Sequence, residues 1–196
     1  LNFINKFKKV DFFYIFLNTR KIYSLGENLS ENSKIKPKDN YANNKYITEQ
    51  SLKKKIKNKL ISLRISNIIG KRIYKKTRNS HKLFFDNFLL YKKKILKDKK
   101  KIYVNNDFKD FLSINQFCRI ISQIIKLKLN GIFNVSISEK IYVDELISWI
   151  DEGFLKNIKL VKSNKDSFTL SNKKLLKKIK IKISKNQLKK FCKKLI

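Results

Sequence analysis

The chain has 196 residues, of which 42% are apolar, so it is long enough to bury a sizeable core. It carries 48 Lys and Arg residues against 15 Asp and Glu, a formal charge of +33. No apolar run approaches the length of a membrane span, and no segment resembles a secretory signal. Cys118 and Cys192 lie far apart, outside any metal-binding or redox spacing. The sequence therefore favours a cytoplasmic protein without disulfides, a metal site or a membrane span.

The positive charge has two explanations. Clustered cations bind nucleic acids or anionic membranes by displacing counterions from phosphates. However, only five of the 48 cations are Arg, and the other abundant residues are Asn, Ile, Phe, Leu and Tyr. Most of these residue types have AT-rich codons, so the second explanation is an AT-rich genome, which would enrich any protein surface in Lys. Nucleic-acid recognition, in contrast, relies on Arg. We therefore expect no specific nucleic-acid partner. Filter binding that is tight, sequence-dependent and retained at physiological salt would contradict this expectation.

In chain order, the first half predicts two buried strands and a long helix. Residues 2–9 have the pattern of a helix end, and the apolar run 10–17 predicts a strand covered on both faces. The polar segment 24–40 contains the only Pro and is predicted to be a loop. Asp39 or Asn40 is then expected to cap a helix that extends to about residue 57. Residues 59–66 predict the second buried strand.

The second half continues the alternation of helices and strands. Helices are predicted at 80–96, 114–127 and 143–150, and strands at 101–104 and 131–137. From residue 171 onward, apolar residues at helical spacing predict surface helices with basic faces. Trp149 is expected to be a core residue. Alternating strands and helices predict an α/β fold with a parallel sheet.

Tyr41 and Lys45 are four residues apart on the predicted helix, so their side chains lie on one face. A tyrosine has an ordinary pKa of about 10, which is too high for a base at neutral pH. A neighbouring ammonium stabilises the phenolate and lowers that pKa, so that the tyrosine can act as an acid or base. In a lysine-rich chain this spacing also arises by chance, with a packed Tyr beside a solvated Lys as the alternative.

Five segments in a fixed order resemble the extended short-chain dehydrogenase/reductases, the NAD-dependent epimerase and dehydratase family. Thr19 follows a buried strand, as the family's Ser or Thr does, and Tyr41-x-x-x-Lys45 is followed by Glu49. The later segments are LRISNIIG, DFKDFLSIN and GIFNV, the last followed by a DEL-containing helix. They are similar to the family's later blocks and occupy residues 63–70, 107–115, 131–135 and 144–146.

The resemblance implies roles for residues that match the family pattern. Thr19 is expected to hydrogen-bond the substrate hydroxyl, Tyr41 to be the acid/base, and Lys45 to tune Tyr41 and bind the nicotinamide ribose. Three further residues complete the expected cofactor and substrate contacts. These are Ser66 near the nicotinamide, Asn67 near the substrate, and Lys109 where the family often has a phosphate-binding Arg.

Other positions depart from the family pattern or match it weakly. His81, the only His, is a candidate substrate contact, with a partly exposed structural His as the alternative. Arg20 and Lys21 stand where sugar 4,6-dehydratases have an Asp-Glu pair, which argues against dehydration. Asn115 replaces a customary Asp.

The Gly-rich turn with which these enzymes begin is missing from the sequence. Such a turn lets a pyrophosphate approach backbone N–H groups at a helix N-terminus. Gly26, Gly70, Gly131 and Gly153 are too far apart in the sequence to form one. We therefore expect a fragment or the product of a disrupted gene, with a partner chain as the alternative.

Together, these features predict the C-terminal portion of a Rossmann-type sheet with a smaller α/β substrate lobe. Residues 1–70 are expected to be the second half of an NAD(P)-binding domain, and 71–196 mainly the substrate lobe, with 131–137 returning to the sheet. The resemblance implies a nucleotide-sugar epimerase or keto-sugar reductase that uses NAD or NADP and acts on a nucleotide-sugar substrate, and it allows a homodimer. A catalytically inactive remnant is the alternative.

Overall fold

A three-stranded parallel sheet forms the centre of the fold. A computed structural model describes residues 11–71, 88–93, 97, 102–163 and 165–195. The sheet has the order β1–β3–β8, formed by Tyr14–Thr19, Leu60–Ile65 and Gly131–Val135. All residues of β3 except Ile65 are buried, as expected for a central strand between two parallel neighbours. The carboxyl ends of the three strands therefore meet at one edge of the sheet.

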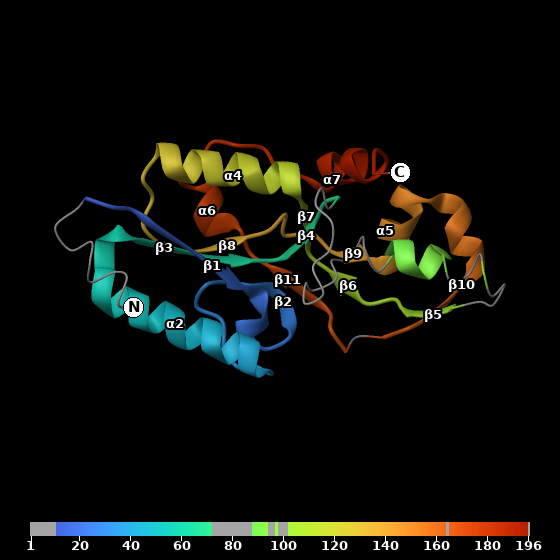
Figure 1. The fold of residues 1–196 in the computed structure, drawn as a ribbon, viewed down its shortest axis with the longest axis horizontal. Helices are drawn as coiled ribbons and strands as arrows, with labels where there is room; N and C mark the ends of the chain where they lie inside the picture. The colour runs from blue at the N-terminus through green and yellow to red at the C-terminus, as the bar shows by residue number, and fades with distance from the viewer. Residues whose placement is uncertain (1–10, 72–87, 94–96, 98–101, 164, 196) are drawn as a thin grey trace.

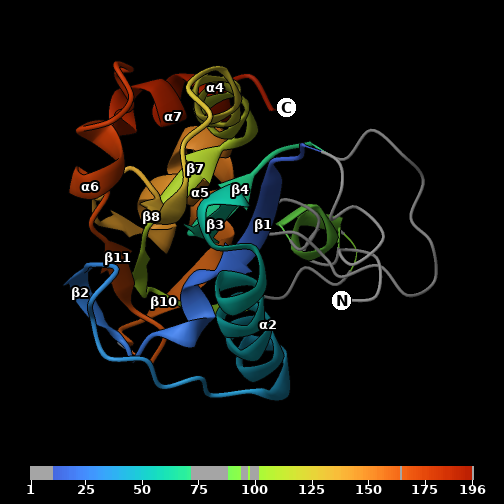
Figure 2. The same cartoon turned by 90° about the vertical axis from the view of Figure 1, so that its left-hand side faces the viewer.

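Helices cover both faces of this sheet. Figures 1 and 2 show α2 (Asn40–Ile56) on one side and α4 (Ile114–Lys126) on the other. The carboxylate of Asp39 caps α2 by accepting the Ala42 N–H at 2.7 Å. Helix α4 begins with a capping box, in which the Ser113 hydroxyl and the Gln116 side chain bond each other's backbone N–H groups.

The remaining strands form two-stranded pairs beside the sheet. Three pairs are parallel: β2 (Gly26–Leu29) with β11 (Phe168–Leu170), β4 (Asn67–Ile69) with β7 (Phe111–Ser113), and β5 (Ile102–Asn105) with β10 (Ile158–Val161). One pair is antiparallel: β6 (Phe108–Lys109) with β9 (Ile141–Tyr142). Figure 1 shows β5 and β10 at the end of the molecule remote from α2.

Shorter helices complete the described chain. The α-helices are α5 (Val143–Ile150), α6 (Lys173–Leu176) and α7 (Lys185–Cys192), and residues 88–93 are also helical. The 3-10 helices are η1 (Arg20–Ile22), η2 (Lys57–Lys59) and η3 (Glu152–Asn157). No helix in the described ranges is long and apolar enough to cross a membrane.

The largest buried apolar cluster joins the sheet to the helices of the second half. It includes Leu63 of β3, Phe133 of β8, Ile120 of α4 and Trp149 of α5, which confirms Trp149 as a core residue. A smaller cluster lies between η1, the start of α2 and β11, where Ile22, Ala42 and Phe168 pack together. This second cluster fixes the start of α2 against the end of β1.

The α/β class and the parallel sheet are confirmed, and several boundaries are corrected. The first strand begins at Tyr14 and extends to Thr19, later than the predicted 10–17. The predicted loop 24–40 is wrong at Gly26–Leu29, because pairing with the distant β11 makes a strand of a polar segment. Basic surface helices form at the C-terminus as α6 and α7, although 177–184 are not helical. The predicted helix end at 2–9 and most of the helix at 80–96 lie outside the described residues.

Candidate functional site

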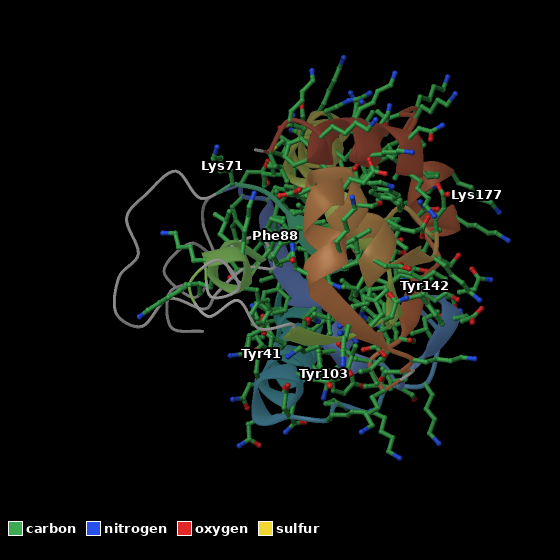
Figure 3. All side chains as sticks on the ribbon, turned by 90° about the vertical axis from the view of Figure 1, so that its right-hand side faces the viewer. Tyr41, Lys71, Phe88, Tyr103, Tyr142 and Lys177 are labelled. Atoms are coloured by element: carbon green, nitrogen blue, oxygen red, sulfur yellow. The ribbon has the colours of Figure 1, made fainter. Side chains whose placement is uncertain are left out.

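Tyr41 and Lys45 lie together at the amino-terminal end of α2. The Lys45 ammonium nitrogen is 5.9 Å from the centroid of the Tyr41 ring. Lys45 Nζ also donates a hydrogen bond of 2.9 Å to the backbone carbonyl of Leu17, near the end of β1. Tyr41 is 54% exposed and lies at the surface of the molecule (Figure 3). An ammonium thus neighbours a phenol that remains open to a ligand.

Thr19 is the last residue of β1. Residues on either side of it contact α2 and the N-cap residue of that helix. One contact is the hydrogen bond from Lys45 to Leu17, two residues before Thr19. The other is an ion pair of 3.4 Å between Lys21 Nζ and an Asp39 carboxylate oxygen. The Thr19 hydroxyl accepts the Lys21 N–H at 3.3 Å. The structure therefore brings Thr19, Tyr41 and Lys45 to the same end of the sheet.

Ser66 and Asn67 follow β3 at this carboxyl edge. The Ser66 N–H donates to the Val135 carbonyl at 3.0 Å, which continues the sheet pairing beyond β3. The Ser66 hydroxyl is buried and has no hydrogen-bond partner among the described residues. Asn67 begins β4, and its N–H donates to the Asp110 carbonyl at 3.3 Å. A buried hydroxyl without a hydrogen bond costs free energy unless a ligand supplies the missing partner. The Ser66 hydroxyl is therefore suited to hydrogen-bond a bound group.

Lys109 on β6 is part of an ion-pair cluster with Arg20 and Asp166. Its ammonium nitrogen lies 2.8 Å from Asp166 Oδ2, and Arg20 Nη2 lies 2.7 Å from Asp166 Oδ1. The Arg20 guanidinium also stacks on Phe168, 3.8 Å from the ring centroid. The two cations hold the pKa of Asp166 below its ordinary value, although burial acts in the opposite direction. The remaining candidate, His81, lies outside the described residues.

A buried network centred on Glu49 fixes the helix that carries Tyr41 and Lys45. Glu49 is fully buried, and its carboxylate accepts two hydrogen bonds from Arg64, with Nη2 at 2.6 Å and Nε at 3.2 Å. It also accepts the Ser62 hydroxyl at 2.6 Å and the Asn18 amide at 2.8 Å. Burial alone would raise the pKa of Glu49, but Arg64 and these donors hold that pKa below its ordinary value.

This network joins all three strands of the sheet to α2. Arg64 Nη1 donates to the Tyr23 hydroxyl at 2.8 Å, and that hydroxyl donates to Asn134 Oδ1 on β8, also at 2.8 Å. Burial raises the pKa of Tyr23, while Arg64 opposes the rise. Glu49 follows Lys45 by one helical turn, so the network sets the position of both site residues along the sheet. The spacing of Glu49 after Lys45 and the Arg in the next strand are visible in the sequence, but their pairing was not predicted.

Asp110 is a second buried carboxylate, within a segment that resembles the family and at a position for which the sequence predicts no role. It accepts three backbone N–H groups: those of Ile137 at 3.1 Å, Ser138 at 3.1 Å and Leu170 at 3.2 Å. It therefore ties the end of β8 to β11. Burial raises the pKa of Asp110 to about 7, although the three N–H donors lower it.

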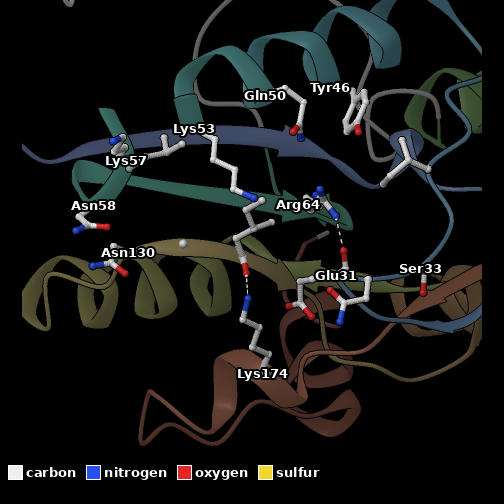
Figure 4. Close-up of a pocket in the computed structure, with 15 residues that line it drawn as sticks. Glu31, Ser33, Tyr46, Gln50, Lys53, Lys57, Asn58, Arg64, Asn130 and Lys174 are labelled. Atoms are coloured by element: carbon white, nitrogen blue, oxygen red, sulfur yellow. Dashed lines mark hydrogen bonds between the residues drawn. The ribbon is translucent and has the colours of Figure 1, made fainter. Parts of the chain in front are cut away.

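A cavity of about 700 Å³ lies beside β3 and β8 and extends along α2 (Figure 4). Its lining includes Leu60 and Gly131, the first residues of β3 and β8, together with Lys53, Lys57 and Lys174. The lining also includes Arg64, which belongs to the network around Glu49, and Tyr46 of α2, but neither Tyr41 nor Lys45. No group of three potential metal ligands lies close enough together to hold an ion within the described ranges.

The sequence matches no protein-family model and no curated protein, whereas the structure matches many solved ones. A dTDP-glucose 4,6-dehydratase from Bacillus anthracis, in complex with NAD, aligns with a TM-score of 0.73 and 15% identity. A UDP-glucose 4-epimerase from Stenotrophomonas maltophilia with bound NAD aligns with a TM-score of 0.74 and 12% identity. A UDP-N-acetylglucosamine 4-epimerase from Methanobrevibacter ruminantium aligns with a TM-score of 0.67 and 17% identity.

These matches cover nearly all of this chain and part of each known structure. They include 98%, 96% and 92% of this chain, but 63%, 64% and 60% of the respective known chains. The chain thus spans less than two thirds of the length of each. The described residues therefore share the α/β fold of these known nucleotide-sugar enzymes.

Proposed function

We propose that this chain carries the acid/base and substrate-binding residues of an NAD(P)-dependent nucleotide-sugar epimerase or keto-sugar reductase. The supporting observation is the meeting of Thr19, Tyr41 and Lys45 at the carboxyl edge of a parallel sheet, with Lys45 bonded to the Leu17 carbonyl. The 196 residues contain no Gly-rich turn, so the proposed activity belongs to an enzyme in which another segment supplies one.

In this proposal Tyr41 moves the proton. A nicotinamide bound at Lys45 and Ser66 would supply hydride transfer to and from the reacting sugar carbon. The Tyr41 phenolate takes the proton of the hydroxyl on that carbon while the carbonyl forms, and Tyr41 returns a proton in the reductive direction. The Thr19 hydroxyl orients the reacting sugar hydroxyl. The Lys45 ammonium lies 5.9 Å from the centroid of the Tyr41 ring, which supports this role because a nearby cation stabilises a phenolate.

The described residues fit a bound dinucleotide and nucleotide sugar. Lys45 has three N–H donors and uses one on Leu17, which leaves two for the hydroxyls of a ribose. The unpaired Ser66 hydroxyl is available at the neighbouring strand end. On the substrate side, Asn67 and Lys109 are proposed contacts. His81 stays a prediction from the sequence.

The decisive experiment is Tyr41→Phe in a protein in which this chain is joined to a Gly-rich dinucleotide-binding segment. Loss of the phenolic proton should lower kcat by about 10²–10⁴-fold, with a smaller change in KM. Tyr46→Phe is the matched control, because Tyr46 is on the same helix and packs against the cluster around Ile22. Turnover is measured from nicotinamide absorbance for a reductase, or from coupled product detection for an epimerase. Full turnover after Tyr41→Phe would disprove the acid/base role.

A further inference from the structure

The cluster of Arg20, Lys109 and Asp166 has more hydrogen-bond donors than it uses. Arg20 is 9% exposed, yet its guanidinium makes one hydrogen bond within the described structure, to Asp166. Its other contact is the face of Phe168. A guanidinium has five N–H donors, so a largely buried Arg with one bond has capacity for a further acceptor. The Lys109 ammonium likewise uses one of its three donors, also on Asp166.

Asp166 is the only carboxylate that pairs with these two cations in the part of the chain that the structure describes. Asp107, two residues before Lys109, forms no ion pair with either of them there. The Asp166 side chain is 45% exposed, whereas those of Arg20 and Lys109 are 10% and 22% exposed. The cations are therefore held in place, while the carboxylate between them faces solvent. The Ser167 hydroxyl next to Asp166 is buried and has no hydrogen-bond partner in the described part of the chain.

We propose that Arg20 and Lys109 form a phosphate-binding pair whose place for an oxyanion is taken by the Asp166 carboxylate in the free protein. A phosphate offers more oxygens and more charge than a carboxylate, and a guanidinium can engage two of those oxygens at once. Binding then exchanges Asp166 for a phosphate group of the nucleotide-sugar substrate. This inference rests on the proposed function. It adds Arg20 as a binding residue and Asp166 as an internal competitor.

The test compares binding of inorganic pyrophosphate by the wild-type chain and by Asp166→Asn, using calorimetry at about 0.15 M salt to screen general lysine attraction. We expect Asp166→Asn to bind about tenfold more tightly, because the internal competitor is lost. In the Asp166→Asn background, Arg20→Gln and Lys109→Gln should each cancel that gain. Circular dichroism establishes that each variant is folded.

Matched controls separate this effect from net charge. Asp151→Asn removes the same charge from another Asp–Lys pair, in which Asp151 lies 2.6 Å from Lys92. Lys53→Gln removes a cation that lines the cavity beside β3 and β8. If Asp166→Asn gains no more affinity than Asp151→Asn, the proposal is wrong. If Asp166→Asn does not fold, wild-type affinity that is unchanged by both Arg20→Gln and Lys109→Gln overturns the proposal instead.

Two diphosphate ligands distinguish the substrate from the cofactor as the source of the phosphate. UDP should gain affinity from Asp166→Asn, whereas ADP-ribose, which represents the cofactor, should not. A gain for ADP-ribose alone would overturn the assignment to the substrate. None of these measurements depends on turnover. Failure of the proton-transfer proposal would therefore leave this result intact.

Discussion

Two ion-pair clusters in this molecule use the same chemistry in opposite ways. Glu49 is fully buried, and Arg64, Ser62 and Asn18 surround its carboxylate with donors. Asp166 is also paired with cations, but its side chain is 45% exposed. Removing a charged group from water costs several kcal/mol of desolvation free energy. A buried carboxylate therefore needs all its hydrogen-bond and ion-pair partners, whereas an exposed carboxylate can exchange them for water or a ligand. The comparison separates a cluster that fixes the fold from one that can bind a ligand.

The largest expected effect is on the Glu49 cluster. Glu49→Gln keeps the side-chain shape but leaves the Arg64 guanidinium buried without its counter-ion. We expect the free energy of unfolding to fall by about 3–5 kcal/mol. The control Glu27→Gln removes a half-exposed ion pair, in which Glu27 lies 2.7 Å from Lys140. This change should lower the free energy of unfolding by less than about 1 kcal/mol. Urea unfolding of the two variants measures the difference, and equal losses would refute the structural role of Glu49.

The pH dependence of stability tests whether burial raises the pKa of the Asp110 carboxyl. Its pKa rises from 3.8 to about 7 on folding, so the folded chain binds more protons than the unfolded chain between these values. The stabilising contribution is complete below about pH 4 and is lost as the pH rises through about 7. The change amounts to roughly 4 kcal/mol across that window. Glu49, whose pKa is lowered, contributes in the opposite sense, with stability lost as the pH falls.

Asp110→Asn isolates this contribution, because an amide does not titrate. Subtracting the pH profile of the variant's unfolding free energy from that of the wild type should give a curve that declines between about pH 4 and 7. A flat difference curve would mean that the Asp110 pKa is not raised by folding. Guanidinium chloride is unsuitable here because its salt screens charges, so urea is the denaturant of choice.

The smallest expected effect is on the stability of the Asp166 cluster. Asp166→Asn should lower the free energy of unfolding by less than about 1 kcal/mol, because water screens a half-exposed pair. Thermal and urea unfolding measure this change beside that of Glu49→Gln. A loss as large as that of Glu49→Gln would show that Asp166 holds the fold together, and the contrast between the clusters would disappear.

The sequence predicts those parts of the fold that have local signals. The N-cap at Asp39 and the buried strand β3 depend on residues that are close together in the sequence, and both predictions are confirmed. Strands β2 and β11 are not, because short segments become strands only by pairing across about 140 residues. For the same reason Asp166 could not be predicted as a site residue: its partner Arg20 is 146 residues away, and no motif surrounds it. Tyr41 and Lys45 are predicted as a pair because a one-turn spacing and the ordered segments around it are both visible in the sequence.

Arg64 shows where a chain that uses Lys almost everywhere still requires Arg. It donates from Nε, Nη1 and Nη2 at once, to Glu49, to Tyr23 and to the Glu31 carbonyl. A lysine has a single nitrogen and cannot reach these acceptors together. Arg64→Lys would therefore leave some of these buried acceptors without a donor, although the charge is kept.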